Sequence, residues 1–224
     1  MNNFDAQRNE ICRVGRSLFE RGHVHATAGN ISMRLPDGAG FLITPTDACL
    51  GLLQPGQLAH TDTAGQQIEG HEVPRPSKTL ALHRAIYAAE PLAHSVIHTH
   101  STHLVALTLI GVWSEACALS PSTPFFVMKV GRVPLIAYHR PGHPAAAELV
   151  AQAIEAARAA GTPIRAVMLD RLGPNVWHDS PAAASAVLEE LEETARLWLL
   201  SERRAVPLSD AQIDELRSAF GADW

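Results

Sequence analysis

Two histidines separated by a single residue are the sharpest chemical signal in the sequence. His98 and His100 lie in residues 95–100, a segment whose apolar residues predict a strand. Alternate residues of a strand point to one face, so the two imidazoles would converge on one point, as a metal site requires. Imidazole suits zinc and similar divalent ions, and no cysteine lies near the pair, which favours an open catalytic site over a closed structural one. The alternative is a chance pair, because the chain has 12 histidines and His23 and His25 share this spacing.

A third histidine follows the pair closely. His103 falls in the first turn of the helix that we expect over residues 101–110, directly after the strand. Its imidazole would therefore lie near enough to contact a substrate or to orient a metal ligand. Since histidine exchanges a proton near neutral pH, His103 is a candidate proton donor.

Three short polar turns form a second signal. They contain Gly29 and Asn30, then Thr46, and then Ser77 and Lys78, each at the boundary of an expected element. Small residues with free backbone N–H groups at such boundaries bind anions, and a lysine beside a helix start suits a phosphate or a carboxylate. Each turn alone is more simply explained as a helix cap or a chain reversal.

The elements that must position these residues alternate between helical and strand periodicity. This alternation predicts a mixed α/β fold, and no linker, repeat or low-complexity tract divides residues 1–224, so we expect one domain. The apolar residues 127–138 predict two short strands around Gly131. The expected helices cover residues 5–21, a segment starting near residue 76, and 101–110, 144–160, 180–202 and 210–220, and the other expected strands cover residues 31–34, 41–44, 95–100 and 164–169.

Composition argues against several functional classes. The formal charge is −5, from 18 basic and 23 acidic side chains, which argues against a nucleic-acid-binding surface. The longest near-apolar run, residues 104–113, is half of the ~20 residues that a membrane helix needs, so we expect no membrane partner. A polar start without a signal-peptide core and three scattered cysteines indicate a cytoplasmic protein.

The motifs, taken in order, resemble the class II aldolase/adducin superfamily. They read TAGNIS, LITPT, PSKTLALHRAIY and VIHTHSTH. Within that superfamily the chain is similar to the 3-oxo-tetronate 4-phosphate decarboxylases over residues 14–200, including the segments TPFFVMKVGRVPL, YHRPG and LEELEETARL. The resemblance implies a three-layer α/β/α domain around a largely antiparallel central sheet. It also implies one divalent metal ion, expected to be zinc, and a homotetramer with active sites near subunit interfaces.

The resemblance assigns roles to particular positions. His98 and His100 match two of the three metal-binding histidines of the superfamily. The positions that match those holding the substrate phosphate and neighbouring polar groups are Gly29, Asn30, Thr46, Ser77 and Lys78.

Two departures from the superfamily pattern affect the chemistry. Thr79 stands where the superfamily has an acid, usually glutamate, and a hydroxyl cannot act as a carboxylate base near neutral pH. Leu172 stands where the superfamily has its third histidine, and leucine cannot bind a metal ion. Substitute ligands are conceivable, and the sequence does not rank them: Glu72, Asp170, His139, His143 and His178.

Two functions follow from these observations. The first is a metal-dependent lyase acting on a phosphorylated sugar acid, by decarboxylation of a 3-oxo-tetronate 4-phosphate or by a related aldol-type C–C cleavage. Its electrophile would be the metal ion, and its proton donor would be water, Lys78 or His103. The second is a catalytically altered or inactive homologue that binds a sugar phosphate or serves as an interaction module. Loss of carbon dioxide needs no base to remove a proton from carbon, so Thr79 harms a decarboxylase less than an aldolase.

Overall fold

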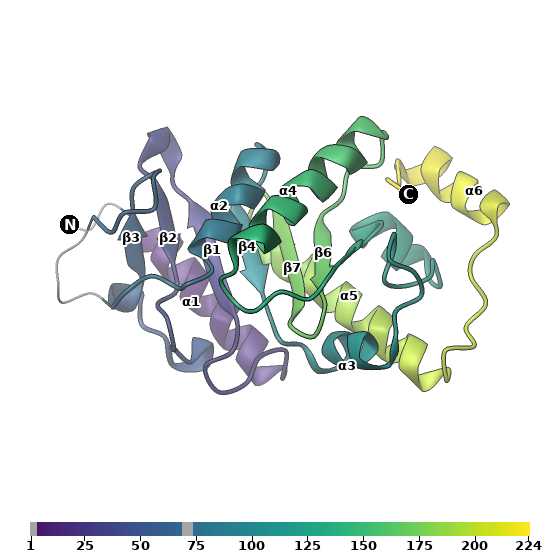
Figure 1. Cartoon of the computed structure of the whole chain (residues 1–224), viewed down its shortest axis with the longest axis horizontal. Helices are drawn as coiled ribbons and strands as arrows, with labels where there is room; N and C mark the ends of the chain where they lie inside the picture. Colours follow the sequence, from purple (N-terminus) through teal and green to yellow (C-terminus); the bar gives the residue numbers. More distant parts are fainter. Residues whose placement is uncertain (1–3, 69–73) are drawn as a thin grey trace.

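Seven strands form one sheet between two layers of helices in the computed structural model of the chain, which describes residues 4–68 and 74–224 (Figure 1). The strand order is β3-β2-β1-β4-β7-β6-β5, and only the β5–β6 pair is parallel. This arrangement confirms the expected α/β/α fold with a largely antiparallel sheet. The strands are β1 (Asn30–Arg34), β2 (Phe41–Ile43), β3 (Ala59–Thr61), β4 (Ser95–His98), β5 (Leu135–Ile136), β6 (Ala166–Leu169) and β7 (Gly173–His178).

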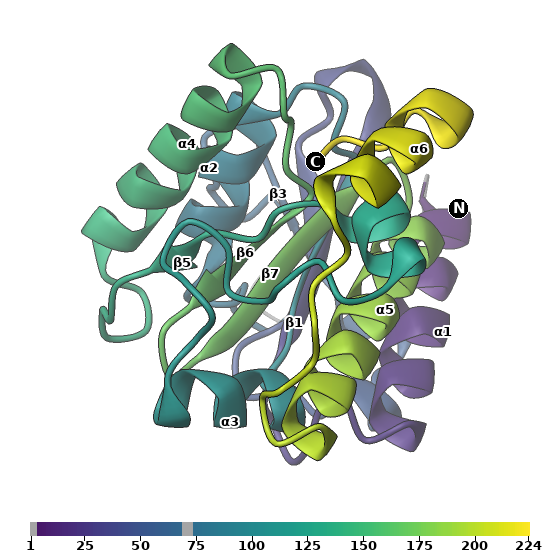
Figure 2. The same cartoon turned by 90° about the vertical axis from the view of Figure 1, so that its right-hand side faces the viewer.

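The helices cover the two faces of the sheet unequally. Helices α2 and α4 pack on one face, and α1, α3 and α5 pack on the other (Figure 2). The helices are α1 (Asp5–Glu20), α2 (Leu80–Ala89), α3 (Thr102–Ile110), α4 (Pro144–Ala159), α5 (Pro181–Leu200) and α6 (Asp210–Phe220). Short 3₁₀ turns cover Pro36–Gly38, Leu50–Leu52 and Pro55–Gln57.

Neighbouring residues of the central strands point to opposite faces, as the pleat of a sheet requires. On β4, Ile97 packs in the cluster with α1, α3 and α5, whereas Val96 packs in the cluster with α2 and α4. On β7, Val176 and Trp177 divide in the same way. Both faces of the central strands are therefore buried, so we look for functional polar residues of these strands at the strand ends.

Three local expectations were wrong. Residues 126–130 form a π-helical turn instead of a strand, because the Thr123 hydroxyl accepts a hydrogen bond from Phe126 N at 3.1 Å and starts a helical turn. Strand β4 ends at His98, so His100 lies beyond it. Helix α2 begins at Leu80, which leaves the Ser77–Lys78 step in the turn before the helix.

The C-terminal part of the chain follows its sequence signals. A capping box between Ser209 and Gln212 starts α6, as expected for residues 210–220, and Gly221 ends that helix in the left-handed conformation. The chain end returns to the body of the protein, where Trp224 is buried with its ring edge-on to Phe126 at 5.6 Å. Within residues 4–68 and 74–224, none of the helices is long and apolar enough to cross a membrane.

Candidate functional site

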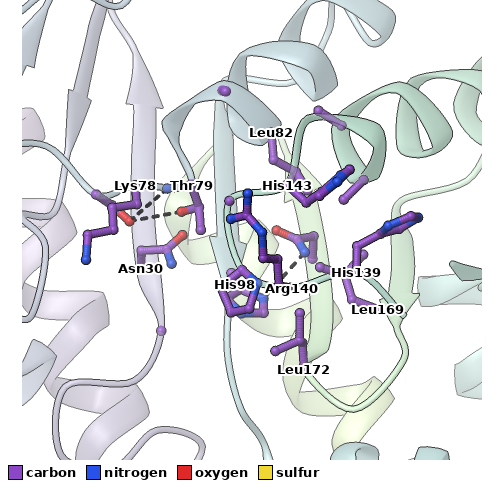
Figure 3. Close-up of a pocket in the computed structure, with 18 of the residues that line it drawn as sticks. Asn30, Lys78, Thr79, Leu82, His98, His139, Arg140, His143, Leu169 and Leu172 are labelled. Carbon is purple, nitrogen blue, oxygen red and sulfur yellow. Dashed lines mark hydrogen bonds between the residues drawn. The ribbon is translucent and has the colours of Figure 1, made fainter. Parts of the chain in front are cut away.

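A row of three polar side chains forms the floor of a cavity on the sheet face that α2 and α4 cover (Figure 3). The strand register places Asn30 opposite His98 and His98 opposite Asn175, so one residue comes from each of β1, β4 and β7. All three are buried, and all three line the same cavity of about 550 Å³. This volume suits a small organic ligand. No sequence signal marks Asn175, because only the pairing of β4 with β7 places it beside His98.

The environment of His98 fixes its charge and its tautomer. Its Nδ1 lies 2.8 Å from the carbonyl oxygen of Pro174, which only accepts, so Nδ1 carries the proton and Nε2 has a free lone pair. Burial, together with the nearby His100, lowers the pKa of His98 to about 4. The ring is therefore neutral at physiological pH, and its Nε2 can accept a hydrogen bond or bind a metal ion.

His100 stays close to His98 although it lies beyond the strand. The two ring centroids are 5.0 Å apart, with the rings 70° from parallel, and both residues line the cavity. Burial also lowers the pKa of His100, with a smaller contribution from His25. The two imidazoles expected to act together therefore do lie together.

The residues expected to bind phosphate surround one part of this cavity. Gly29 has a φ of +84°, and a Cβ there would lie 2.9 Å from His98 O, so only glycine lets this turn approach the end of β4. The other lining residues of this group are Asn30, Thr46, Ser77 and Lys78. The structure thus brings the five predicted residues to one place, next to the histidine pair.

The donors of this anion cradle, defined as Gly29, Asn30, Thr46, Ser77 and Lys78, differ from those expected. The amide of Thr46 donates to Arg75 O at 3.0 Å, and the amide of Ser77 donates to Thr44 O at 3.1 Å. These two amides are therefore not free for a ligand. The donors that remain in the cradle include the Thr46 and Ser77 hydroxyls, the Asn30 side-chain amide and the Lys78 ammonium, next to the positive N-terminal end of α2.

Both departures from the superfamily pattern line the cavity. The Thr79 hydroxyl lies 2.9 Å from the Ser77 hydroxyl, so a neutral hydrogen-bonded group fills the position of the acid. Leu172 is half-buried and lies in the turn between β6 and β7. That turn approaches the chain after β4 so closely that a Cβ on Gly173, whose φ is +107°, would lie 2.3 Å from Thr99 O.

The donor atoms around His98 and His100 do not fit the metal site that the resemblance implies. Within residues 4–68 and 74–224, no three His, Cys, Asp or Glu side chains are grouped so that they could hold a metal ion. Among the substitute ligands considered, Asp170 and His178 are not part of the cavity lining, and Glu72 lies outside the described residues. His139 and His143 do line the cavity, with their rings stacked at 5.2 Å.

His103 lies away from the cavity. Glu192 of α5 accepts hydrogen bonds from the His103 ring at 2.8 Å, from His103 N at 3.0 Å and from Leu104 N at 3.1 Å. The carboxylate thus satisfies backbone donors at the start of α3. His103 is not among the residues that line the cavity, and the contact that the structure gives its ring is with Glu192.

Two buried oxygen atoms in the cavity floor lack a partner in the described part of the chain. They are Oδ1 of Asn30 and Oδ1 of Asn175, whose side chains are 6% and 1% exposed. Leaving a buried acceptor unsatisfied costs about 1–3 kcal/mol, which a ligand that donates hydrogen bonds would recover. The floor therefore suits a polyhydroxylated molecule better than an apolar one.

Comparison with known proteins gives a consistent result. Residues 9–199 match the family described as Class II Aldolase and Adducin N-terminal domain. The chain is 52% identical over 224 residues to the 3-oxo-tetronate 4-phosphate decarboxylase of Cupriavidus necator, which covers 97% of both chains. It is 38% identical over 212 residues to the protein of the same name from Escherichia coli, which covers 94% of this chain and 95% of that one.

Solved structures extend this likeness to the fold. The crystal structure of YgbL from Escherichia coli matches with a TM-score of 0.85 and 37% identity, over 95% of this chain and 98% of that one. An L-fuculose 1-phosphate aldolase matches with a TM-score of 0.80 over 96% of both chains. Its identity is 22%, so this second match concerns the fold alone.

Proposed function

Because the chain belongs to the class II aldolase and adducin family, we propose that it is a carbon–carbon lyase that removes carbon dioxide from a phosphorylated 3-oxo sugar acid. The substrate would be of the 3-oxo-tetronate 4-phosphate type, as in the name of the relative that is 52% identical. The single observation that carries the proposal is the anion cradle, which adjoins the neutral, buried His98 in one cavity.

The reaction is chemically undemanding for such a substrate. The carboxylate lies β to the 3-oxo group, so the electron pair of the broken C1–C2 bond passes to C2 and is delocalised onto the C3 oxygen. C2 then takes one proton, and the products are carbon dioxide and a three-carbon keto phosphate. No base has to remove a proton from carbon, so the neutral Thr79 does not block the reaction. The proton comes from water or from the Lys78 ammonium, which lines the cavity.

The floor residues orient the substrate. The free lone pair of His98 Nε2 and the oxygens of Asn30 and Asn175 are acceptors, and the single hydroxyl of the substrate, on C2, can donate to one of them. The hydroxyls of Thr46 and Ser77 donate to the phosphate, and Lys78 adds a positive charge. Fixing both ends of a small molecule in this way limits its rotation before C–C cleavage.

A second function is favoured by Thr79 and Leu172. With a hydroxyl and an apolar side chain in these positions, the cavity can retain phosphate binding and lose turnover. The chain would then bind a sugar phosphate as an altered homologue, or serve as an interaction module.

One experiment separates the two functions. The purified chain is incubated with 3-oxo-tetronate 4-phosphate, with and without a chelator, and the release of carbon dioxide and of keto phosphate is compared with a protein-free blank. The blank is required because 3-oxo acids also lose carbon dioxide unaided. Release above the blank that Lys78→Met reduces supports the lyase. Substrate binding without such release supports the second function, and the absence of both contradicts the proposed site.

Several expectations belong to this proposal without a structural test. They are a single domain over residues 1–224, a homotetramer and a cytoplasmic location, whereas zinc, which the resemblance implies, is not part of the proposal because the residues present do not fit its site. Molecular mass in solution and the metal content of the untagged protein are the direct measurements.

A further inference from the structure

A second cationic side chain faces the cavity from the segment that joins β5 to α4. Arg140 belongs to this segment, which lies close to the start of α2, since a Cβ built on Gly142 would be 3.7 Å from Lys78 O. Figure 3 shows the Arg140 side chain pointing toward the centre of the cavity, with its guanidinium above His98 in this view and between Thr79 and His143. The sequence alone does not single out Arg140, because only the path of this segment brings it to the site.

The guanidinium is free to bind a ligand. Within residues 4–68 and 74–224, Arg140 has no side-chain hydrogen bond and no ion pair. The acidic residues of the lining, Asp47 and Glu148, are solvent-exposed, and neither pairs with it in that part of the chain. An acid at position 79 would offer a carboxylate within the same cavity, but Thr79 offers only a hydroxyl that Ser77 already engages.

Lys78, like Arg140, has no side-chain hydrogen bond or ion pair with any other described residue, so the cavity is lined by two such cations with different surroundings. In the view of Figure 3, Lys78 is drawn beside Asn30, whereas the Arg140 guanidinium is drawn above His98. A guanidinium presents two parallel N–H donors, a geometry that matches the two oxygens of a carboxylate.

We propose that Arg140 binds the carboxylate of the sugar acid while Lys78 and the cradle hydroxyls bind its phosphate. This inference rests on the proposed function and deepens it, because it names the residue that distinguishes a phosphorylated sugar acid from a neutral sugar phosphate. Two anionic ends of one ligand would then meet two cations of one cavity.

Carboxylate binding by Arg140 requires no metal ion. The positive charge belongs to the Arg140 side chain itself, so its attraction for a carboxylate does not depend on a bound cofactor. This matters because Thr79 and Leu172 leave only two imidazoles at the superfamily's metal position. Acid recognition should therefore survive treatment with a chelator.

The test compares two stable ligands that differ in one group. Erythronate 4-phosphate carries a phosphate and a carboxylate and has no 3-oxo group to drive decarboxylation, whereas erythritol 4-phosphate has an alcohol in place of the carboxylate. Their affinities are measured by titration calorimetry on the full chain before and after chelator treatment, and on three chelator-treated variants. Arg140→Met removes the charge, Lys78→Met removes the other cation, and Arg196→Met is a matched control, because Arg196 is exposed on α5 outside the cavity.

We expect Arg140→Met to weaken binding of the acid about 10- to 100-fold and binding of the alcohol much less, as for loss of a charged hydrogen bond. Lys78→Met should weaken the binding of both ligands, and Arg196→Met should change the binding of neither. If both ligands bind but Arg140→Met affects them equally or not at all, the inference is wrong while the phosphate site stands. If the chelator abolishes the preference for the acid, a metal ion binds the carboxylate and the inference is also wrong. If neither ligand binds the native chain, the proposed function itself fails.

Discussion

Replacing Leu172 with histidine and Thr79 with glutamate should create a divalent-metal site that the described residues do not form. Both positions line the same cavity as His98 and His100. His98 already presents a free Nε2 lone pair, because its Nδ1 donates to Pro174 O. A third imidazole and a carboxylate would complete a donor set typical of a catalytic zinc site.

The expected gain follows from the number of ligands. Zinc sites with four ligands in peptides contribute about 10–16 kcal/mol, or about 2.5–4 kcal/mol per ligand. Leu172→His alone should therefore tighten zinc binding about 100- to 1,000-fold, and the double variant should bind more tightly still. Leu172 is half-buried against the cluster that contains Leu169, so the metal-free variant should lose about 1–2 kcal/mol of stability. Zinc at 100 times its Kd should return about 2.7 kcal/mol.

Zinc titration of desalted protein measures this effect, with the unfolding temperature as a second readout. Leu172→Gln and Thr79→Gln are matched controls, because they change shape and polarity without adding the missing donors. The reasoning is refuted if the native chain binds one zinc ion as tightly as the double variant and loses it in His98→Ala. It is also refuted if the double variant folds but binds zinc no better than the controls.

Three further predictions concern stability. Gly173→Ala should cost more than about 2 kcal/mol and lower the unfolding temperature by at least about 4 °C, because its Cβ would lie 2.3 Å from Thr99 O at a φ of +107°. Burial lowers the pKa of His83 to about 3 in the folded chain. Below about pH 6.5 the unfolded chain therefore binds a proton at His83 that the folded chain does not, and stability decreases as the pH is lowered. Between pH 7 and 5 this group should cost about 2 kcal/mol, and urea unfolding of His83→Gln should show a decline smaller by that amount. Glu192→Ala removes three hydrogen bonds at the start of α3 and should cost about 2–4 kcal/mol in urea unfolding, with Glu192→Gln losing less.

Much of the fold is predictable because its signals are local. Ser209 and Gln212 start α6, and Gly221 ends it, through hydrogen bonds and backbone angles that involve only neighbouring residues. Hydrophobic periodicity does not distinguish a helix from a strand where every side chain of a segment is buried. Phe126, Val127 and Val130 are all buried, so the apolar run reads as a strand although it forms a π-helical turn.

The residues of the site also differ in whether local sequence signals or tertiary contacts place them there. The histidine pair and the five residues of the anion cradle are marked by residue type and motif, and the structure brings them to one cavity. Asn175 depends on the pairing of β4 with β7, and Arg140 depends on the path of the segment before α4, so the sequence places neither at the site, although Arg140 belongs to the YHRPG segment of the resemblance. For His103, a local sequence signal predicts a place at the site that the tertiary structure does not give it. Its proximity in sequence to the pair is real, but α3 carries it to Glu192 of α5.

The proposed phosphate site and the proposed carboxylate site lie on separate parts of the fold. The cradle joins turns held together by backbone pairing, such as the bridge between Pro45 and Pro76. Leu172 lies instead in the β6–β7 turn, and Arg140 lies between β5 and α4. A substitution in either segment can therefore change the cation that meets the substrate without displacing the phosphate. For this reason, the absence of a metal-binding side chain at position 172 does not by itself indicate that the chain no longer binds sugar phosphates. Affinity for sugar phosphates and turnover must be measured separately.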